Sequence, residues 1–180
     1  MTSGETRIRH RMIKLLVLAA GVMILFTGVA FGATSATITL KGTVAGILEI
    51  TITPEAGHDS LDFASLQNGL LVATVTERSN LAAGYTVTIE SANATSAGGG
   101  AQFFRSATNP NSNTDTLDYT MDYGGVAVIL VNGRALVSDV SQKTPGAGFQ
   151  KQLTISYDAS MAFLTADAYQ DTLTFTIAAK

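Results

Sequence analysis

The stretch Leu173-Thr174-Phe175-Thr176-Ile177 alternates apolar residues with threonine. Thr86-Val87-Thr88-Ile89-Glu90 repeats this pattern, and so does Thr37-Ile38-Thr39-Leu40-Lys41-Gly42-Thr43-Val44. A period of two predicts strands with one buried face and one solvated face. Threonine suits the outward positions, because its branched Cβ favours a pleated strand while its hydroxyl stays in water.

Six further segments have the composition of strands, and turn signals separate them. They are residues 47–53, 71–77, 117–123, 126–131, 134–138 and 152–157. The strongest turn signal is Asn132-Gly133, because both residues tolerate the positive φ of a tight hairpin. The composition of residues 92–116 predicts a long irregular segment. We expect Phe103-Phe104, near its middle, to hold it against the core. About nine short strands and no long amphipathic helix after residue 35 predict an all-β protein, an antiparallel β-sandwich of one domain.

Residues 1–35 differ in composition from the rest of the chain. Four basic side chains lie within the first 14 residues, an almost unbroken apolar run covers residues 13–31, and small residues follow. This order is typical of a secretory signal peptide, which we expect to end at Ser35. The alternative is an uncleaved N-terminal membrane anchor, since the apolar run is long enough to cross about 30 Å. In both cases the remainder of the chain leaves the cytoplasm.

The exported part is acidic and has few groups suited to catalysis. Thirteen of the 14 acidic residues but only seven of the 11 basic residues follow residue 35, which disfavours binding to nucleic acid and to anionic membranes. The chain has no cysteine. His58, Asp59 and Ser60 are adjacent in the sequence, so they cannot adopt the geometry of a catalytic triad. Asp118 and Asp122 lie too far apart on one predicted strand to share a calcium ion. We therefore expect no catalytic, metal or cofactor site.

The two ends of the exported part carry the main functional signal. The last predicted strand, residues 169–179, has neither charge nor proline between Leu173 and Ile177, so its outer edge lacks the usual protection against pairing. The first predicted strand, residues 37–44, follows the leader closely. Either this first strand folds back beside the last one in the same molecule, or strands are exchanged between molecules by β-strand addition.

These features resemble the chaperone–usher pilins, which are incomplete immunoglobulin-like sandwiches that lack their final strand. The segment Ile38-Thr39-Leu40-Lys41-Gly42-Thr43-Val44 looks like a donor strand of that family, and residues 168–177 look like its last strand. Residues 117–125 and 151–156 are similar in kind and order to interior strands of such subunits. The likeness is greatest to cysteine-free pilins of the alternate chaperone class and to the spore coat protein U group.

The resemblance implies an antiparallel immunoglobulin-like β-sandwich over residues 36–180 that is completed by donor-strand exchange. Residues 36–45 would form the donor strand, and its inward-facing residues would be Ile38, Leu40, Gly42 and Val44. The acceptor groove, which is also the edge that a chaperone covers, would be lined by Tyr169, Leu173, Phe175 and Ile177.

The function that the resemblance implies is that of a structural, non-catalytic subunit of a bacterial fimbria, exported through the periplasm to the cell surface. The implied partners are other copies of the chain, a periplasmic chaperone, an outer-membrane usher and, where one is present, a tip adhesin. The alternative is a self-complete monomeric sandwich, secreted or periplasmic, that closes its own edge with residues 37–44 and binds carbohydrate or a protein partner.

Overall fold

The computed structural model describes residues 34–160 and 162–180. All but the last two residues of the predicted signal peptide lie outside these described residues. The strands are β1 (Leu48–Pro54), β2 (Leu66–Ser79), β3 (Tyr85–Ser91), β4 (Phe103–Ser106), β5 (Thr116–Asp118), β6 (Thr120–Tyr123), β7 (Val126–Ala127), β8 (Arg134–Val140), β9 (Phe149–Asp158), β10 (Tyr169–Gln170) and β11 (Leu173–Ala179). One short helix, α2 (Ala92–Ser96), lies among them.

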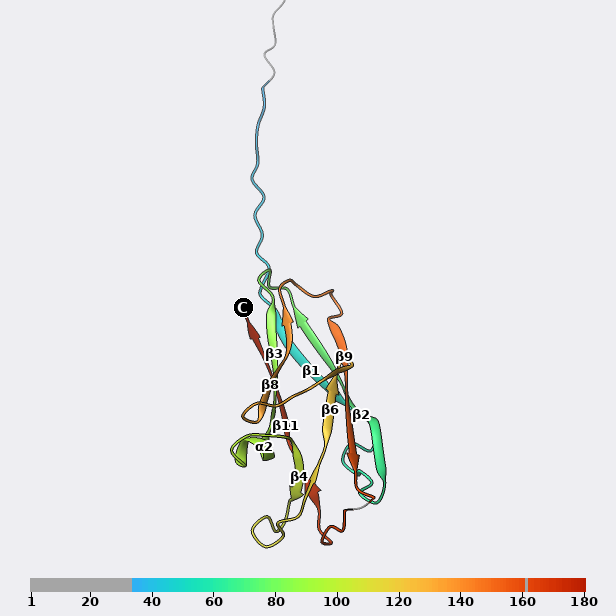
Figure 1. Ribbon diagram of the computed structural model, residues 1–180. Helices are drawn as coiled ribbons and strands as arrows, with labels where there is room; N and C mark the ends of the chain where they lie inside the picture. Colours follow the sequence, from blue (N-terminus) through green and yellow to red (C-terminus); the bar gives the residue numbers. More distant parts are fainter. Residues whose placement is uncertain (1–33, 161) are drawn as a thin grey trace, which may run out of the picture. The chain divides into compact units, whose positions relative to one another are not determined.

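The strands form antiparallel sheets, which confirms the predicted all-β sandwich. One sheet has the order β1-β2-β9-β6-β7, and a second has the order β11-β3-β8. A third, small sheet has the order β10-β4-β5. Figure 1 shows β11, β3 and β8 as one group of strands and β2, β9 and β6 as another.

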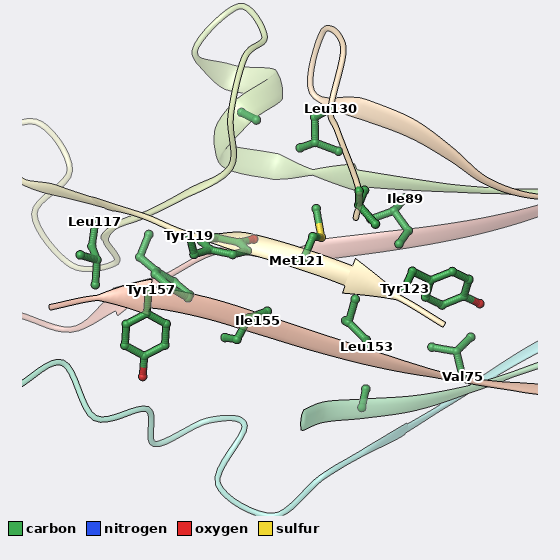
Figure 2. Packing of buried hydrophobic residues seen from close by; sticks show 14 of the residues in the cluster. Val75, Ile89, Leu117, Tyr119, Met121, Tyr123, Leu130, Leu153, Ile155 and Tyr157 are labelled. Carbon is green, nitrogen blue, oxygen red and sulfur yellow. The ribbon is translucent and has the colours of Figure 1, made fainter. Parts of the chain in front are cut away.

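The alternating residues occupy the faces that their spacing predicts. In β3, Tyr85, Val87 and Ile89 are fully buried, whereas the threonines between them are half-buried. The core brings together side chains from both larger sheets, among them Ile89 of β3 from one sheet and Met121 of β6 and Ile155 of β9 from the other (Figure 2). Burial of apolar area in this layer is the main favourable contribution to folding.

The segment between β3 and β5 contains more regular structure than its composition predicts. Residues 92–96 form α2, which is capped by Ser91, whose hydroxyl accepts a hydrogen bond from the backbone N–H of Ala94 at 3.1 Å. Phe104 is buried and stacks on Tyr119 with ring centroids 4.5 Å apart. The prediction that the Phe103-Phe104 pair holds this segment to the core is thus confirmed for Phe104.

Two predicted strands are interrupted. Residues 117–123 divide at Tyr119 into β5 and β6, which belong to different sheets. Residues 126–131 form a strand only over β7, because the chain then leaves the five-stranded sheet and reaches β8 through an isolated bridge between Val131 and Arg134. The Asn132-Gly133 turn is present as predicted, with φ values of 54° and 76°.

Residues 34–47 contain no strand, although residues 37–44 have a clear strand pattern. The compact unit that contains all the strands is Val44–Lys180, and residues 34–43 lie outside that unit. An alternating pattern shows that a segment can pair with a strand, and pairing itself needs an available partner. The prediction of a strand over residues 37–44 is therefore corrected. The alternating pattern is present, but the segment pairs with no strand among the described residues.

Candidate functional site

Two strands at the edges of different sheets lie next to each other. Strand β1 ends the five-stranded sheet, and β11 ends the three-stranded sheet. The Cα atoms of β1 and β11 approach within 8 Å. Each of the two strands has its hydrogen-bonded neighbour on one side, β2 for β1 and β3 for β11. Edge strands of this kind present a row of backbone N–H and C=O groups to an added strand.

A mainly apolar cleft of ≈ 200 Å³ opens between these two edges. Its walls are Ile52 and Pro54 from β1 and Leu173 and Phe175 from β11. Its floor consists of core side chains from several strands, namely Val72, Ala73, Phe104, Tyr119, Leu153 and Ile155. His58, Leu61 and Asp171 complete the lining. The sandwich interior is thus accessible along this edge.

Side chains on the inner faces of both edge strands lack full cover. In β1, Leu48 is 37% exposed and Ile52 is 42% exposed. In β11, the inward-facing residues Leu173, Phe175 and Ile177 are only half-buried. Burial of a large apolar side chain contributes about 1.5–3 kcal/mol relative to full exposure. An added apolar strand that covers these side chains would therefore stabilise the sandwich.

Asp171 marks one end of the cleft and was not anticipated from the sequence. Its carboxylate accepts hydrogen bonds from the Ser91 hydroxyl at 2.6 Å and the Tyr119 hydroxyl at 2.7 Å. It also accepts from the backbone N–H groups of Asn93 and Thr172. Burial, together with the nearby Asp171 charge, raises the pKa of Tyr119. The carboxylate therefore ties β11 to the start of α2 and to the aromatic core.

The structure separates the four predicted groove residues. Leu173 and Phe175 line the cleft, and Ile177 lies further along β11, opposite Val87. Tyr169 belongs instead to β10, where it pairs with Ser106. The predicted continuous last strand over residues 169–179 is wrong, because the chain leaves one sheet at Gln170 and enters another at Leu173.

Tyr169 has a structural role outside the cleft. Its hydroxyl donates to the carbonyl oxygen of Thr165 at 2.9 Å and accepts from the Asn113 side chain at 2.9 Å. Its ring packs edge-on against Phe63, with centroids 6.3 Å apart. These contacts place it in the small sheet, where it lines a second pocket that shares His58, Leu61 and Asp171 with the cleft, so its role in the groove stays a prediction.

The predicted donor residues are accessible. Ile38 and Leu40 are each 85% exposed, and Val44 is 89% exposed. A Cβ at Gly42 would have no heavy atom within 4 Å. Three large apolar side chains with the same parity are therefore available for burial against another surface.

A second cluster, also unanticipated, surrounds the buried carboxylate of Glu77 in β2. This side chain is fully buried and accepts hydrogen bonds from the hydroxyl groups of Tyr85 at 2.9 Å, Tyr123 at 2.6 Å and Ser138 at 2.5 Å. The ammonium group of Lys151 lies 3.4 Å from the same carboxylate. Burial, and the hydrogen bonds to Glu77, raise the pKa values of both tyrosines. This network connects both larger sheets and satisfies a charge that would otherwise be costly to bury.

The groups first considered for chemistry lie in surface turns and strands. His58 is in a turn, with its Nδ1 atom 2.8 Å from the carbonyl oxygen of Glu55. Asp118 lies in β5 and Asp122 lies in β6, and these strands belong to different sheets. Within residues 34–160 and 162–180, no three acidic or histidine side chains are arranged to hold a metal ion. In the same part of the chain, no helix has the length and hydropathy needed to cross a membrane.

Comparison with known proteins gave no match, either to a protein-family model or to a curated protein sequence.

Proposed function

We propose that this chain is a structural subunit of a bacterial surface fibre, and that it polymerises by donor-strand exchange. Residues 36–45 of one copy would occupy the cleft between β1 and β11 of the next copy. The observation that carries this proposal is the combination of two features in one chain. One is an apolar cleft between two edge strands, and the other is an alternating segment whose apolar side chains are exposed.

The two features are chemically complementary. A strand added at this edge would gain backbone hydrogen bonds from β11 or β1, and it would bury Ile38, Leu40 and Val44 against the cleft. At about 1.5–3 kcal/mol for each apolar side chain, the joint would be tight and slow to dissociate. Threonines and Lys41 on the opposite face of the segment would keep the free donor strand soluble.

The remaining parts of the proposal concern export. The leader, residues 1–35, would direct the chain to the periplasm, where a chaperone would cover the open edge until an outer-membrane usher brings the next subunit. Exchange of the chaperone for a donor strand needs no ATP if completing the sandwich releases the free energy that the chaperone withheld. The fibre subunit needs no cofactor and catalyses no reaction.

Electron microscopy of the cell surface, with and without the gene, tests this proposal. We expect fibres on cells that carry the gene, loss of fibres on its deletion and their return on complementation with the full chain. Light scattering of the purified protein provides the second measurement. A species that stays monomeric at all concentrations, on cells without fibres, would instead support the self-complete monomeric sandwich.

A further inference from the structure

A single asparagine extends the β1–β2 ladder beyond its last strand residue. Strand β2 ends at Ser79, opposite Leu48. Asn80 follows, and its backbone N–H donates to the carbonyl oxygen of Ile47 at 3.2 Å. Its side-chain Oδ1 accepts from the backbone N–H of Ile47 at 2.6 Å, and its Nδ2 donates to the carbonyl oxygen of Ala45 at 2.8 Å. The side chain thus replaces a strand as the partner of residues 45–47.

We propose that Asn80 is a clamp that prevents the leading segment from folding back into the cleft of its own chain, and so reserves that cleft for a second copy. The proposal rests on the function proposed above and identifies the residue that selects exchange over self-closure. The two side-chain hydrogen bonds hold residues 45–47 in line with β1, whereas self-closure requires the chain to reverse direction at that point.

The register of a self-closed chain shows why this position matters. A three-residue hairpin loop at residues 45–47 would place Leu40 opposite Ile52 and Ile38 opposite Pro54. Ile52 and Pro54 form the β1 wall of the cleft. Residues directly opposite in an antiparallel pair lie on the same face, so the apolar side chains would enter the cleft. This loop cannot form while Asn80 binds Ala45 and Ile47.

Reversal before residue 45 leaves the clamp intact but fails to fill the cleft. A two-residue loop at residues 43–44 would place Ile38 opposite Glu49, which turns the apolar side chains to the outer face. A three-residue loop at residues 42–44 would turn the apolar side chains to the inner face again, but it would place Ile38 opposite Leu48 and leave no donor residue opposite Ile52. Neither register delivers an apolar donor residue to Ile52. Release of the Asn80 clamp is therefore required for productive self-closure.

A disulfide trap in the full chain measures self-closure directly. The natural sequence has no cysteine, so a Thr39→Cys, Thr53→Cys pair is free of competing thiols. These two residues are opposite each other only in the self-closed register described above, and both face outward. The yield of this disulfide is measured in three proteins: the cysteine pair alone, the pair with Asn80→Ala, and the pair with Asn68→Ala as the matched control. Asn68 lies near the other end of β2 and binds Ser156.

We expect Asn80→Ala to raise the yield of intramolecular disulfide about tenfold, the change that a loss of about 1.4 kcal/mol produces. Asn68→Ala should leave this yield unchanged. An additional Gly46→Val substitution should lower the yield again, because a β-branched residue favours extended backbone; its Cβ would lie 3.5 Å from Leu81, an ordinary contact. Far-UV circular dichroism checks that each variant is folded. If Asn80→Ala does not fold, Asn80→Asp replaces it: this variant can keep the bond from the Ile47 N–H, but it replaces the bond to Ala45 with repulsion between two oxygen atoms.

Two results overturn the clamp. One is an equal disulfide yield with and without Asn80, and the other is a high yield in the natural background. Association of the cysteine-free chain, followed separately by light scattering, tests the proposed function. If the chain associates but Asn80→Ala does not change the disulfide yield, the fibre proposal stands and the clamp proposal is wrong. If the natural chain self-closes and never associates, both the clamp proposal and the fibre proposal are wrong.

Discussion

The ring of Phe175, on the wall of the cleft, packs against the ring of Tyr123, with centroids 5.8 Å apart and planes inclined at 48°. The hydroxyl of Tyr123 donates to the buried carboxylate of Glu77 at 2.6 Å. The open edge of the sandwich is therefore in contact with the polar network that joins its two larger sheets. Changes at the cleft wall should accordingly affect the stability of the whole fold.

Phe175→Ala tests this contact. We expect a loss of about 2 kcal/mol in the free energy of unfolding, which is below the usual range for a phenylalanine because the side chain is only half-buried. Thr176→Ala, on the exposed face of the same strand, should change it by less than about 0.5 kcal/mol. Denaturant unfolding measures both, and equal losses for the two variants would show that Phe175 is not part of the core.

Glu77→Gln tests the buried network. The substitution removes the charge that pairs with Lys151 and leaves an amide N–H₂ facing hydroxyl donors. We expect a loss of about 2 kcal/mol in the free energy of unfolding. Glu49→Gln breaks an exposed ion pair with Arg78 at 3.5 Å and should cost no more than about 0.5 kcal/mol. A Glu77→Gln protein as stable as Glu49→Gln would contradict the role given to this carboxylate.

The tyrosines should make the fold sensitive to alkali. Burial raises the pKa of Tyr85, Tyr119 and Tyr123 above the ordinary value of about 10. The unfolded chain therefore releases these protons at lower pH than the folded chain. The stability that the neutral phenols contribute is present in full below about pH 10 and falls as the pH rises above it.

Tyrosinate absorbance followed against pH checks this expectation. In the folded protein, ionisation of these three side chains should coincide with unfolding rather than precede it. In denaturant, all the tyrosines should ionise together near pH 10. Ionisation of every tyrosine at that pH in a chain that stays folded would contradict the burial of these hydroxyl groups.

Leu40→Asp should abolish association of residues 36–180. A carboxylate at an inward position of the donor strand would have to be buried without a partner, which is strongly unfavourable. Thr39→Asp places the same group on the outward face and should leave association intact. The molar mass of the purified proteins by light scattering distinguishes the two. Polymers formed equally well by both variants would exclude residues 36–45 as the donor strand.

Strict alternation predicted a strand correctly for two of the three stretches that show it, residues 86–90 and 173–177, and failed for residues 37–44. Strands β3 and β11 lie where the period of two predicts them, because each buries one face against the core, and β8 and β9 lie where strand composition and turn signals predict them. The assignment of Leu173 and Phe175 to a groove came from the family resemblance, and both residues line the cleft. Alternation does not show which strands become neighbours, so the closeness of β1 and β11, and the place of Ile52 in the cleft, were not predictable from it.

The features that the sequence concealed depend on contacts between distant residues. Asp171 interrupts an apparently continuous strand because Ser91 and Tyr119 bind its carboxylate across about 50–80 residues of chain. Glu77 is the last residue of a predicted strand, where a charged side chain is usually exposed. Three hydroxyl groups from other strands make its full burial possible. Asn80 differs from an ordinary turn asparagine only through its bonds to Ala45 and Ile47.

Mixing two defective subunits tests the central claim most directly. Leu40→Asp disables the proposed donor strand but leaves the cleft, and Ile52→Asp blocks the cleft but leaves the proposed donor strand. Light scattering should show monomers for each variant alone and a one-to-one heterodimer, without longer polymers, for the mixture. A mixture that stays monomeric, or either variant polymerising alone, would contradict the exchange of residues 36–45 between copies.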